Sequence, residues 1–138
     1  MLKQRLTHPD ILSALAASGH GSKVLITDGN YPASTMVGEN ADLVYLNLAP
    51  GKPTVTEVLD ILLTAIPVEE AAVMTPDEGP EPLIFQEFRS LMPDTPLTKY
   101  ERFEFYEEAS GPDTCLQIVT GEQRIYANLL LTVGVVKP

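Results

Sequence analysis

The amino-acid sequence predicts an α/β fold: a single domain, residues 1–138, in which a mostly parallel β-sheet is covered by helices on both faces. Short apolar runs typical of buried strands alternate along the chain with stretches whose apolar residues repeat at helical spacing. Such alternation favours βαβ units and a parallel sheet. The length of 138 residues, with 44% hydrophobic and 20% charged residues, suits one globular domain, and no repeat, low-complexity segment or linker divides it.

The first third of the chain is predicted to form one helix and two strands. Pro9 suits a first helical position, and the apolar residues that follow repeat at helical spacing. Gly19 suits the left-handed residue that follows a helix, so the helix is expected to end just before it. Residues 23–27 and 43–48 are apolar runs closed by turn residues, and both predict strands.

A second helix is expected after residue 53. Thr54 and Glu57 have the spacing of a capping box, and an apolar stripe runs from Val55 to Ile66 before Pro67 ends the helix. Beyond it we expect a strand at 71–74, a helix at 83–92, a return to the sheet at 94–100, a helix at 103–109, and strands at 115–119 and 129–136.

Charge and composition exclude several classes of function. The formal net charge is −10, and such a balance repels phosphate backbones and anionic lipid, so nucleic-acid and membrane-surface binding are not expected. No apolar run approaches the roughly 20 residues of a membrane-spanning helix, and the first residues do not read as a secretory signal. The lone Cys115 allows no intrachain disulfide. It favours a reducing compartment, and we expect a cytoplasmic protein.

The most informative stretch for chemistry is residues 18–32, which contains His20 between two glycines and Asp28 directly after the predicted strand 23–27. Histidine is the one side chain whose unperturbed pKa lies near neutrality, so His20 is the first candidate for proton transfer. A carboxylate that follows a strand lies where open α/β sheets usually build their sites. The hypothesis is that His20 and Asp28 meet in a small polar pocket. Asp28 could also be only a turn former.

Three further residues are candidates with a structural alternative. Tyr126 and Asn128 stand at alternate positions at the start of a predicted strand, so they should point to the same side. There they could bond sugar hydroxyls or merely cap the sheet. Arg102 lies among Lys99, Glu101 and other charged residues, and a surface ion pair is its structural alternative.

Other motifs do not point to a site. Residues 19–23 resemble a phosphate-binding loop only superficially, because they precede a strand instead of linking a strand to a helix. His8, His20 and Cys115 form no metal-ligand pattern, so no metal is expected. His8 is expected to help start the helix that follows it, and Cys115 to be a small core residue.

Four motifs in the right order resemble the family of small sugar-anomer enzymes that comprises D-ribose pyranase and L-fucose mutarotase. They are Gly19-His20-Gly21, residues 28–33, residues 102–107, and residues 120–122 followed by Tyr126-Ala127-Asn128. The resemblance runs from Leu12 to Val135. Residues 102–106 look like the fucose branch, whereas Tyr31 stands where relatives vary and the acidic segment 75–82 has no counterpart.

The resemblance implies a function and a set of site residues. It implies a mutarotase that exchanges the α and β anomers of L-fucose or a related aldose, with His20 transferring protons and with Asp28, Arg102, Tyr126 and Asn128 contacting the sugar. It also implies a ring-like homo-oligomer, usually a decamer, with pockets near the subunit boundaries. General acid–base opening and closing of the sugar ring needs no metal or redox cofactor.

Two other functions remain open at this point. The chain could be a pyranase that shifts ribose between pyranose and furanose forms, or a non-catalytic sugar-binding accessory of a transport system. Both enzymes require His20, whereas a passive binder would keep its affinity after His20 is lost. The physiological sugar, the step that His20 performs, the size of the oligomer and the role of segment 75–82 do not follow from the sequence.

Overall fold

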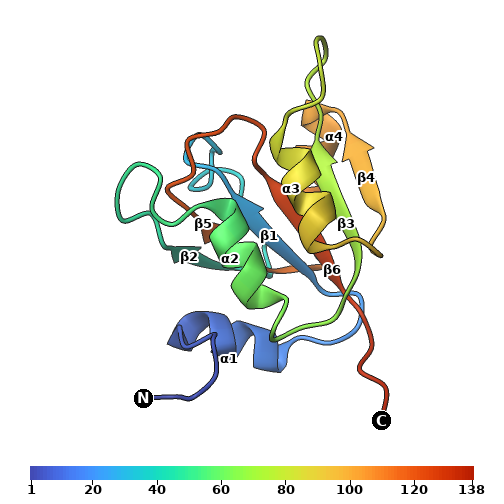
Figure 1. Ribbon diagram of the computed structural model, residues 1–138. Coiled ribbons are helices and arrows are strands. Elements are labelled where there is room, and N and C mark those ends of the chain that lie inside the picture. The colour runs from blue at the N-terminus through green and yellow to red at the C-terminus, as the bar shows by residue number, and fades with distance from the viewer.

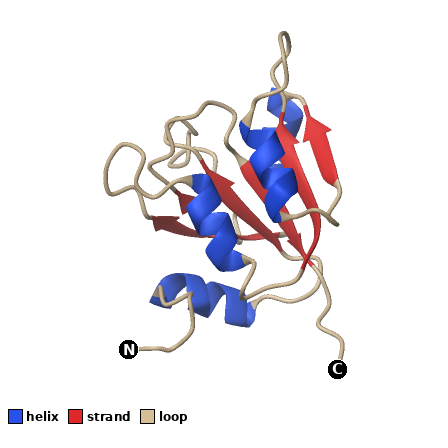
Figure 2. Cartoon of the chain, viewed as in Figure 1, coloured by secondary structure: helices blue, strands red, loops and turns tan.

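The structure, a computed structural model that describes residues 1–138, is built around one six-stranded sheet with helices on both faces (Figure 1). Helices α1, α2 and α3 cover one face and α4 covers the other, and Figure 2 shows the same layers by type of element. The predicted α/β fold class is confirmed. In chain order the elements are α1 (Pro9–Ala17), β1 (Lys23–Thr27), β2 (Asp42–Tyr45), α2 (Val55–Leu62), β3 (Val68–Met74), α3 (Ile84–Leu91), β4 (Leu97–Tyr100), α4 (Arg102–Ala109), β5 (Thr114–Val119) and β6 (Leu129–Val133).

The strand order decides which loops lie together. It is β2-β5-β1-β6-β3-β4, and β6 runs antiparallel to both of its neighbours, while the other three pairings are parallel. Strands β1 to β5 therefore share one direction. We call the end of the sheet at which they finish the carboxyl end, and the opposite one the amino end. Only β6 begins at the carboxyl end, and loops at this end build the sites of open α/β sheets.

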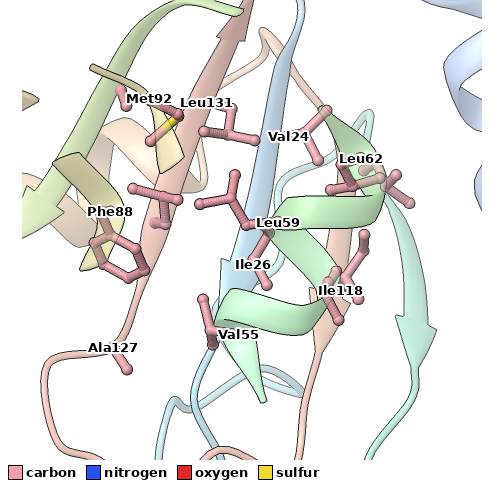
Figure 3. Packing of buried hydrophobic residues seen from close by; sticks show 14 of the residues in the cluster. Val24, Ile26, Val55, Leu59, Leu62, Phe88, Met92, Ile118, Ala127 and Leu131 are labelled. Carbon is pink, nitrogen blue, oxygen red and sulfur yellow. The ribbon is translucent and has the colours of Figure 1, made fainter. Parts of the chain in front are cut away.

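Alternation along the strands divides the buried side chains between the two faces. On β6, Leu129 and Leu131 belong to the cluster under α1, α2 and α3, and Leu130 belongs to the smaller cluster under α4. Figure 3 shows part of the larger cluster, where α2 packs Leu59 against the sheet. Each fully buried side chain of this size contributes about 1.5–3 kcal/mol, so packing, not helix propensity, holds such short helices in place.

Helix α2 has the predicted start and an earlier end than predicted. The Thr54 hydroxyl accepts a bond from the Glu57 N–H at 3.2 Å, and the Glu57 carboxylate accepts one from the Thr54 N–H at 2.7 Å, which confirms the capping box. The regular helix ends at Leu62, and residues 63–65 form a turn. Pro67 disfavours helical geometry at Ile66, so the apolar stripe continues beyond the end of the helix.

Two strands are also shorter than predicted, because each ends where its partner ends. β2 finishes at Tyr45, which pairs with Val119, the last residue of β5. β6 finishes at Val133, which pairs with Val68, the first residue of β3. The apolar residues beyond β6 therefore have no neighbouring strand, and Val136 is exposed.

Candidate functional site

A pocket of about 300 Å³ lies at the carboxyl end of the sheet and gathers four of the five predicted site residues. Asp28 follows β1, Arg102 begins α4 directly after β4, and Tyr126 and Asn128 precede β6. The topology brings these distant segments together because β1 and β4 finish at this end of the sheet and β6 begins there. Their roles in binding stay predictions. The pocket is also lined by Asn30, Tyr31, Met74, Tyr106 and Ile125.

Asp28 is buried and held by a reciprocal pair of bonds with Asn128. The Asp28 N–H donates to the Asn128 Oδ1 at 2.9 Å, and the Asn128 amide donates to the Asp28 Oδ2 at 3.2 Å. The Asn30 N–H donates to the other carboxylate oxygen at 2.9 Å, so the Asp28 side chain also closes a turn. Burial raises the pKa of Asp28, against the opposing effect of these bonds. The carboxyl group is therefore both fixed in place and easier to protonate than an exposed aspartate.

Tyr126 lies in the left-handed region, with φ at 61°, although it is not a glycine. Tyr126 and Asn128 do face the same pocket, as expected, but not through strand alternation, because β6 begins only at Leu129. The turn nevertheless places both at the pocket while it buries Ala127 completely in the larger cluster. Uncommon backbone geometry in a bulky residue is typical of functional sites.

Arg102 is an exposed member of the pocket wall and is not part of a surface ion pair. Its Nε donates to the Tyr106 hydroxyl at 3.4 Å, and its guanidinium carbon lies 5.6 Å from the centre of the Tyr106 ring and 5.7 Å from that of Phe103. The bond to Tyr106 raises the pKa of Arg102 further. Stacking on two rings leaves the other donors of the guanidinium free for a ligand.

His20 lies at the amino end of the sheet, away from the pocket. Its Nε2 is 3.0 Å from both carboxylate oxygens of Glu69 at the start of β3, and both side chains are about half exposed. The hypothesis that His20 and Asp28 meet is therefore wrong within one chain. They flank β1, whose five residues span about 16 Å at roughly 3.3 Å each.

Several residues of both regions escaped the sequence-based prediction. Tyr31 and Tyr106 stand inside motifs that were singled out, but nothing in the pattern showed that their side chains reach the pocket. Glu69 carried no signal, because it meets His20 only through the pairing of β6 with both β1 and β3. His8 accepts a bond from the Ile11 N–H at 3.4 Å and so helps start α1, as predicted.

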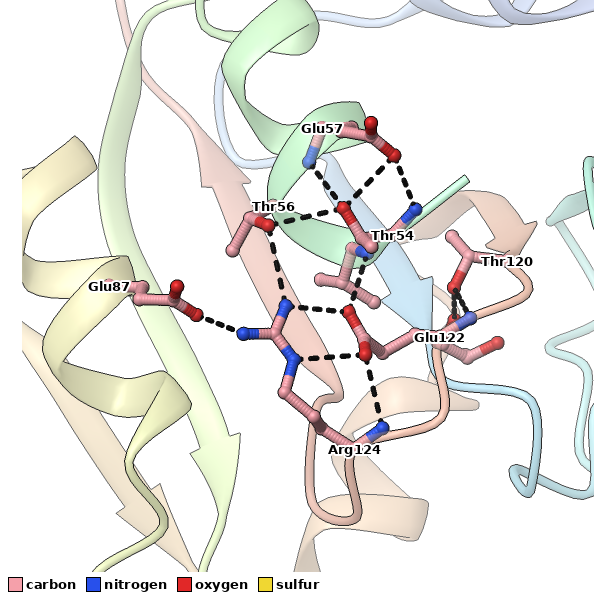
Figure 4. Close-up of polar contacts among 9 residues, drawn as sticks. Thr54, Thr56, Glu57, Glu87, Thr120, Glu122 and Arg124 are labelled. Carbon is pink, nitrogen blue, oxygen red and sulfur yellow. Dashed lines mark hydrogen bonds and ion pairs between the residues drawn. The ribbon is translucent and has the colours of Figure 1, made fainter. Parts of the chain in front are cut away.

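An ion pair between the buried Glu122 and the exposed Arg124 fixes the segment that leads into the pocket (Figure 4). The carboxylate of Glu122 is 3% exposed and accepts bonds from the Arg124 guanidinium at 2.8 and 3.0 Å and from the Val55 N–H of α2 at 3.2 Å. Arg124 also pairs with Glu87 of α3. Burial acts to raise the pKa of Glu122, but the bonds from Arg124 and Val55 outweigh it and lower the pKa. This clamp joins the segment before Tyr126 to two helices.

A larger hollow of about 410 Å³ adjoins the pocket and shares Asn30 with it. Its wall consists of backbone and of neutral amides such as Asn47 and Gln123, and its one carboxylate, that of Glu122, is already paired with Arg124. The smaller pocket has three tyrosines, an arginine and a carboxyl group of shifted pKa. It is the stronger candidate because polar groups of several kinds converge there.

No group of three or more histidine, cysteine, aspartate or glutamate side chains is placed to hold a metal ion. None of the helices has the length and apolar character needed to cross a membrane.

Comparison with known proteins relates the whole chain to sugar enzymes. A family model described as "RbsD / FucU transport protein family" matches residues 1–136. The chain is 30% identical to the fucose mutarotase of Homo sapiens, over 94% of this chain and 90% of that protein. It is 31% identical to a D-ribose pyranase of Clostridium perfringens, over 99% of both. The structure of Bacillus subtilis RbsD complexed with D-ribose matches with a TM-score of 0.82 at 25% identity, over 99% of this chain and 100% of that one.

Proposed function

Because the chain belongs to the RbsD / FucU family, we propose that it interconverts the cyclic forms of a neutral monosaccharide, with the α and β anomers of L-fucose as the leading substrate. Family membership supports mutarotase or pyranase activity. It does not choose the sugar, since fucose and ribose enzymes match at nearly the same identity. The fucose-like motif at residues 102–106 favours fucose.

The observation that carries the proposal is the convergence of Asp28, Arg102, Tyr126 and Asn128 on one pocket. Its volume of about 300 Å³ is at the lower end for small-molecule sites, as a single sugar ring requires. A neutral aldose presents many hydroxyl groups, and a fixed carboxyl group, an amide, phenols and a guanidinium supply both donors and acceptors for them.

Anomer exchange is a pair of proton transfers. A base takes the proton of the anomeric hydroxyl while an acid protonates the ring oxygen, the ring opens, the carbonyl carbon rotates, and closure reverses both transfers. Positioned acid–base groups contribute about 10²–10⁴-fold to such steps. Asp28 and the phenols of three tyrosines are the proton-carrying groups that one chain places in its own pocket, and Asp28 is also held in position by Asn128.

We assign the second proton-carrying group to His20 of another copy of the chain. His20 is exposed at the amino end, and the Glu69 carboxylate at 3.0 Å fixes the orientation of its ring. A contact between the amino end of one copy and the carboxyl end of the next would bring this pair to the pocket that holds Asp28. The glycines on both sides of His20 leave the approach open.

Such a contact joins two different surfaces, and repetition of it gives a ring when the rotation between neighbours closes and an open filament when it does not. Both surfaces carry exposed apolar side chains: Phe103 and Ile125 beside the pocket, and Val135 and Val136 beyond β6 at the amino end. Apolar side chains gathered at one place mark contact surfaces. We propose a ring-shaped homo-oligomer, with the decamer as its size by the resemblance, located in the cytoplasm in keeping with the one free cysteine, Cys115.

The test is saturation-transfer NMR on a panel of unlabelled aldoses, which measures exchange between ring forms at equilibrium. We expect exchange between the α and β anomers of L-fucose that scales with protein concentration. Faster exchange between the pyranose and furanose forms of ribose than between fucose anomers would favour the pyranase alternative. Sugar binding without any exchange would contradict the enzymatic proposal and favour a binding accessory.

A further inference from the structure

The hydroxyl group of Tyr31 is buried at the pocket and has no hydrogen-bond partner in the protein. Buried polar atoms are nearly always paired, so each exception needs a physical explanation. The unpaired buried side-chain atoms belong to Tyr31, Thr114 and Gln117, and of these residues only Tyr31 lines the pocket. In a closed core, an unpaired phenol hydroxyl stays unpaired. In the wall of a pocket, a bound ligand can supply the hydrogen-bond partner that the protein lacks.

The Tyr31 ring is held too firmly to turn its hydroxyl toward solvent. It meets the Tyr106 ring edge to face at a centroid distance of 5.4 Å and the Phe105 ring at 6.5 Å, and the residue is 7% exposed. Its backbone is fixed as well, because the Ala33 N–H donates to the Tyr31 carbonyl at 2.7 Å. The ring is therefore fixed within the smaller cluster, at the wall of the pocket.

The surroundings also keep this phenol protonated. Burial raises the pKa of Tyr31, and the neighbouring Tyr106 and Asp28 raise it further. A protonated phenol can donate a hydrogen bond. Neither neighbouring acceptor takes a bond from it: Asp28 accepts bonds from Asn30 and Asn128, and the Tyr106 hydroxyl accepts one from Arg102, but neither accepts one from the Tyr31 hydroxyl.

We propose that the Tyr31 hydroxyl binds the substrate by donating a hydrogen bond to one hydroxyl oxygen of the sugar. This rests on the proposed function and deepens it, because it makes Tyr31 a residue that selects among aldoses. The sugar reaches the phenol from the side of the pocket, where the wall includes the long and exposed Arg102 side chain. A site built to bond a given hydroxyl discriminates against the analogue that lacks it, because the buried donor is then left unpaired.

A purely structural tyrosine gives the opposite pattern of effects. If the hydroxyl is only an unpaired atom of the core, Tyr31→Phe removes a desolvated polar group, which raises the melting temperature and leaves sugar affinity unchanged. If the hydroxyl binds the sugar, the same substitution lowers affinity although it does not destabilise the sugar-free protein. Only if the proposal holds does Tyr31→Phe lower sugar affinity while the melting temperature stays the same or rises.

The experiment compares the parent protein with Tyr31→Phe and with the control Tyr45→Phe, which alters an exposed tyrosine of β2 outside the pocket. Melting temperature without sugar and the dissociation constant of L-fucose and its monodeoxy derivatives are measured for each. We expect Tyr31→Phe to keep or raise the melting temperature by a few degrees and to weaken fucose binding about three- to ten-fold. For one monodeoxy sugar the parent and Tyr31→Phe should bind equally, and Tyr45→Phe should match the parent throughout.

Two results would overturn this inference and can be told apart. Equal affinity of the parent and Tyr31→Phe for fucose and for every deoxy derivative would show that the hydroxyl does not contact the sugar, and would leave the proposed function intact. No binding of any aldose by the parent protein would overturn the proposed function and this inference together.

Discussion

The two ends of β1 carry the two groups that the sequence singles out, in opposite environments. At the carboxyl end, Asp28 is buried and bonded to Asn30 and Asn128. Replacement of Asp28 would remove hydrogen bonds that hold this part of the fold. At the amino end, His20 is exposed and contacts only Glu69. One end is thus a preformed pocket wall, whereas the other presents an exposed histidine–carboxylate pair to the outside. A chain that needs both can join them only through a second copy of itself.

The largest effect is expected at the exposed end. His20→Gln should lower sugar exchange about 10²–10⁴-fold, because it removes the group assigned to proton transfer. The melting temperature should stay within about a degree of the parent value, because an exposed side chain contributes little to packing. Exchange by saturation-transfer NMR and thermal unfolding are measured on the same samples.

His8→Gln is the control for this substitution, since it changes a histidine that only begins α1. It should leave exchange nearly unchanged. If His20→Gln exchanges the sugar at the parent rate, His20 does not transfer protons in the reaction. A second copy of the chain would then not be needed to complete the site.

The next effect concerns Arg102, which stacks on two rings beside the pocket. Arg102→His should lower the specificity constant for fucose about ten- to hundred-fold, because a hydrogen bond to a charged group contributes roughly 1.5–3 kcal/mol. Exchange of fucose and of ribose is measured for both proteins. A loss smaller than about five-fold for both sugars, the size expected of a surface charge, would place Arg102 outside the binding wall.

Breaking the ion pair between Glu122 and Arg124 is expected to have a smaller effect on activity and a clear effect on stability. Arg124→Gln leaves the buried Glu122 carboxylate without its main partner and should lower the free energy of unfolding by about 2 kcal/mol, below the cost of a fully buried pair because Arg124 is partly exposed. We expect the KM for fucose to rise a few-fold, since Tyr126 follows this segment. Arg5→Gln, which breaks the exposed pair with Asp60, should cost less than about 1 kcal/mol.

The pH dependence of this difference has a definite sign. In the parent the pKa of Glu122 is lowered, so its ion pair stabilises the fold above the ordinary value of 4.5 and that stability is lost as the pH falls below it. In Arg124→Gln the guanidinium bonds are lost, and only the backbone N–H groups of residue 124 and Val55 still oppose the effect of burial, so the pKa of Glu122 should rise. The difference in unfolding free energy between the two proteins should therefore be largest at neutral pH and shrink toward pH 3. A difference that is constant with pH would contradict the clamp.

Local signals in the sequence were enough for most of the fold. Pro9, the capping box of Thr54 and Glu57, and the apolar run at 23–27 each act within a few residues, and the structure has the corresponding elements. Strand pairing is not local, so no pattern indicated that β6 lies antiparallel between β1 and β3. The ends of β2 and β6 depend on their partners and were overestimated for the same reason.

The site was predictable as a set of residues and not as a geometry. The family motifs named Asp28, Arg102, Tyr126 and Asn128, which line one pocket, but the strand alternation assumed for Tyr126 and Asn128 was wrong. The prediction that His20 and Asp28 meet was wrong within one chain because it took closeness in sequence for closeness in space. The strand between the two residues places them at opposite ends of the sheet. The unpaired Tyr31 hydroxyl depends on packing and becomes visible only in the structure.

The most direct test of a site shared between copies is complementation between two inactive variants. His20→Gln keeps an intact pocket, and Asp28→Asn keeps an intact amino end, so an equal mixture unfolded and refolded together should contain sites with both groups present. With random assembly about a quarter of the sites should be intact, and exchange should recover to about that share of the parent rate. Native mass spectrometry shows whether mixed assemblies form. Mixed assemblies with no more exchange than either variant alone, or a parent protein that stays a 15.0 kDa monomer, would contradict the account.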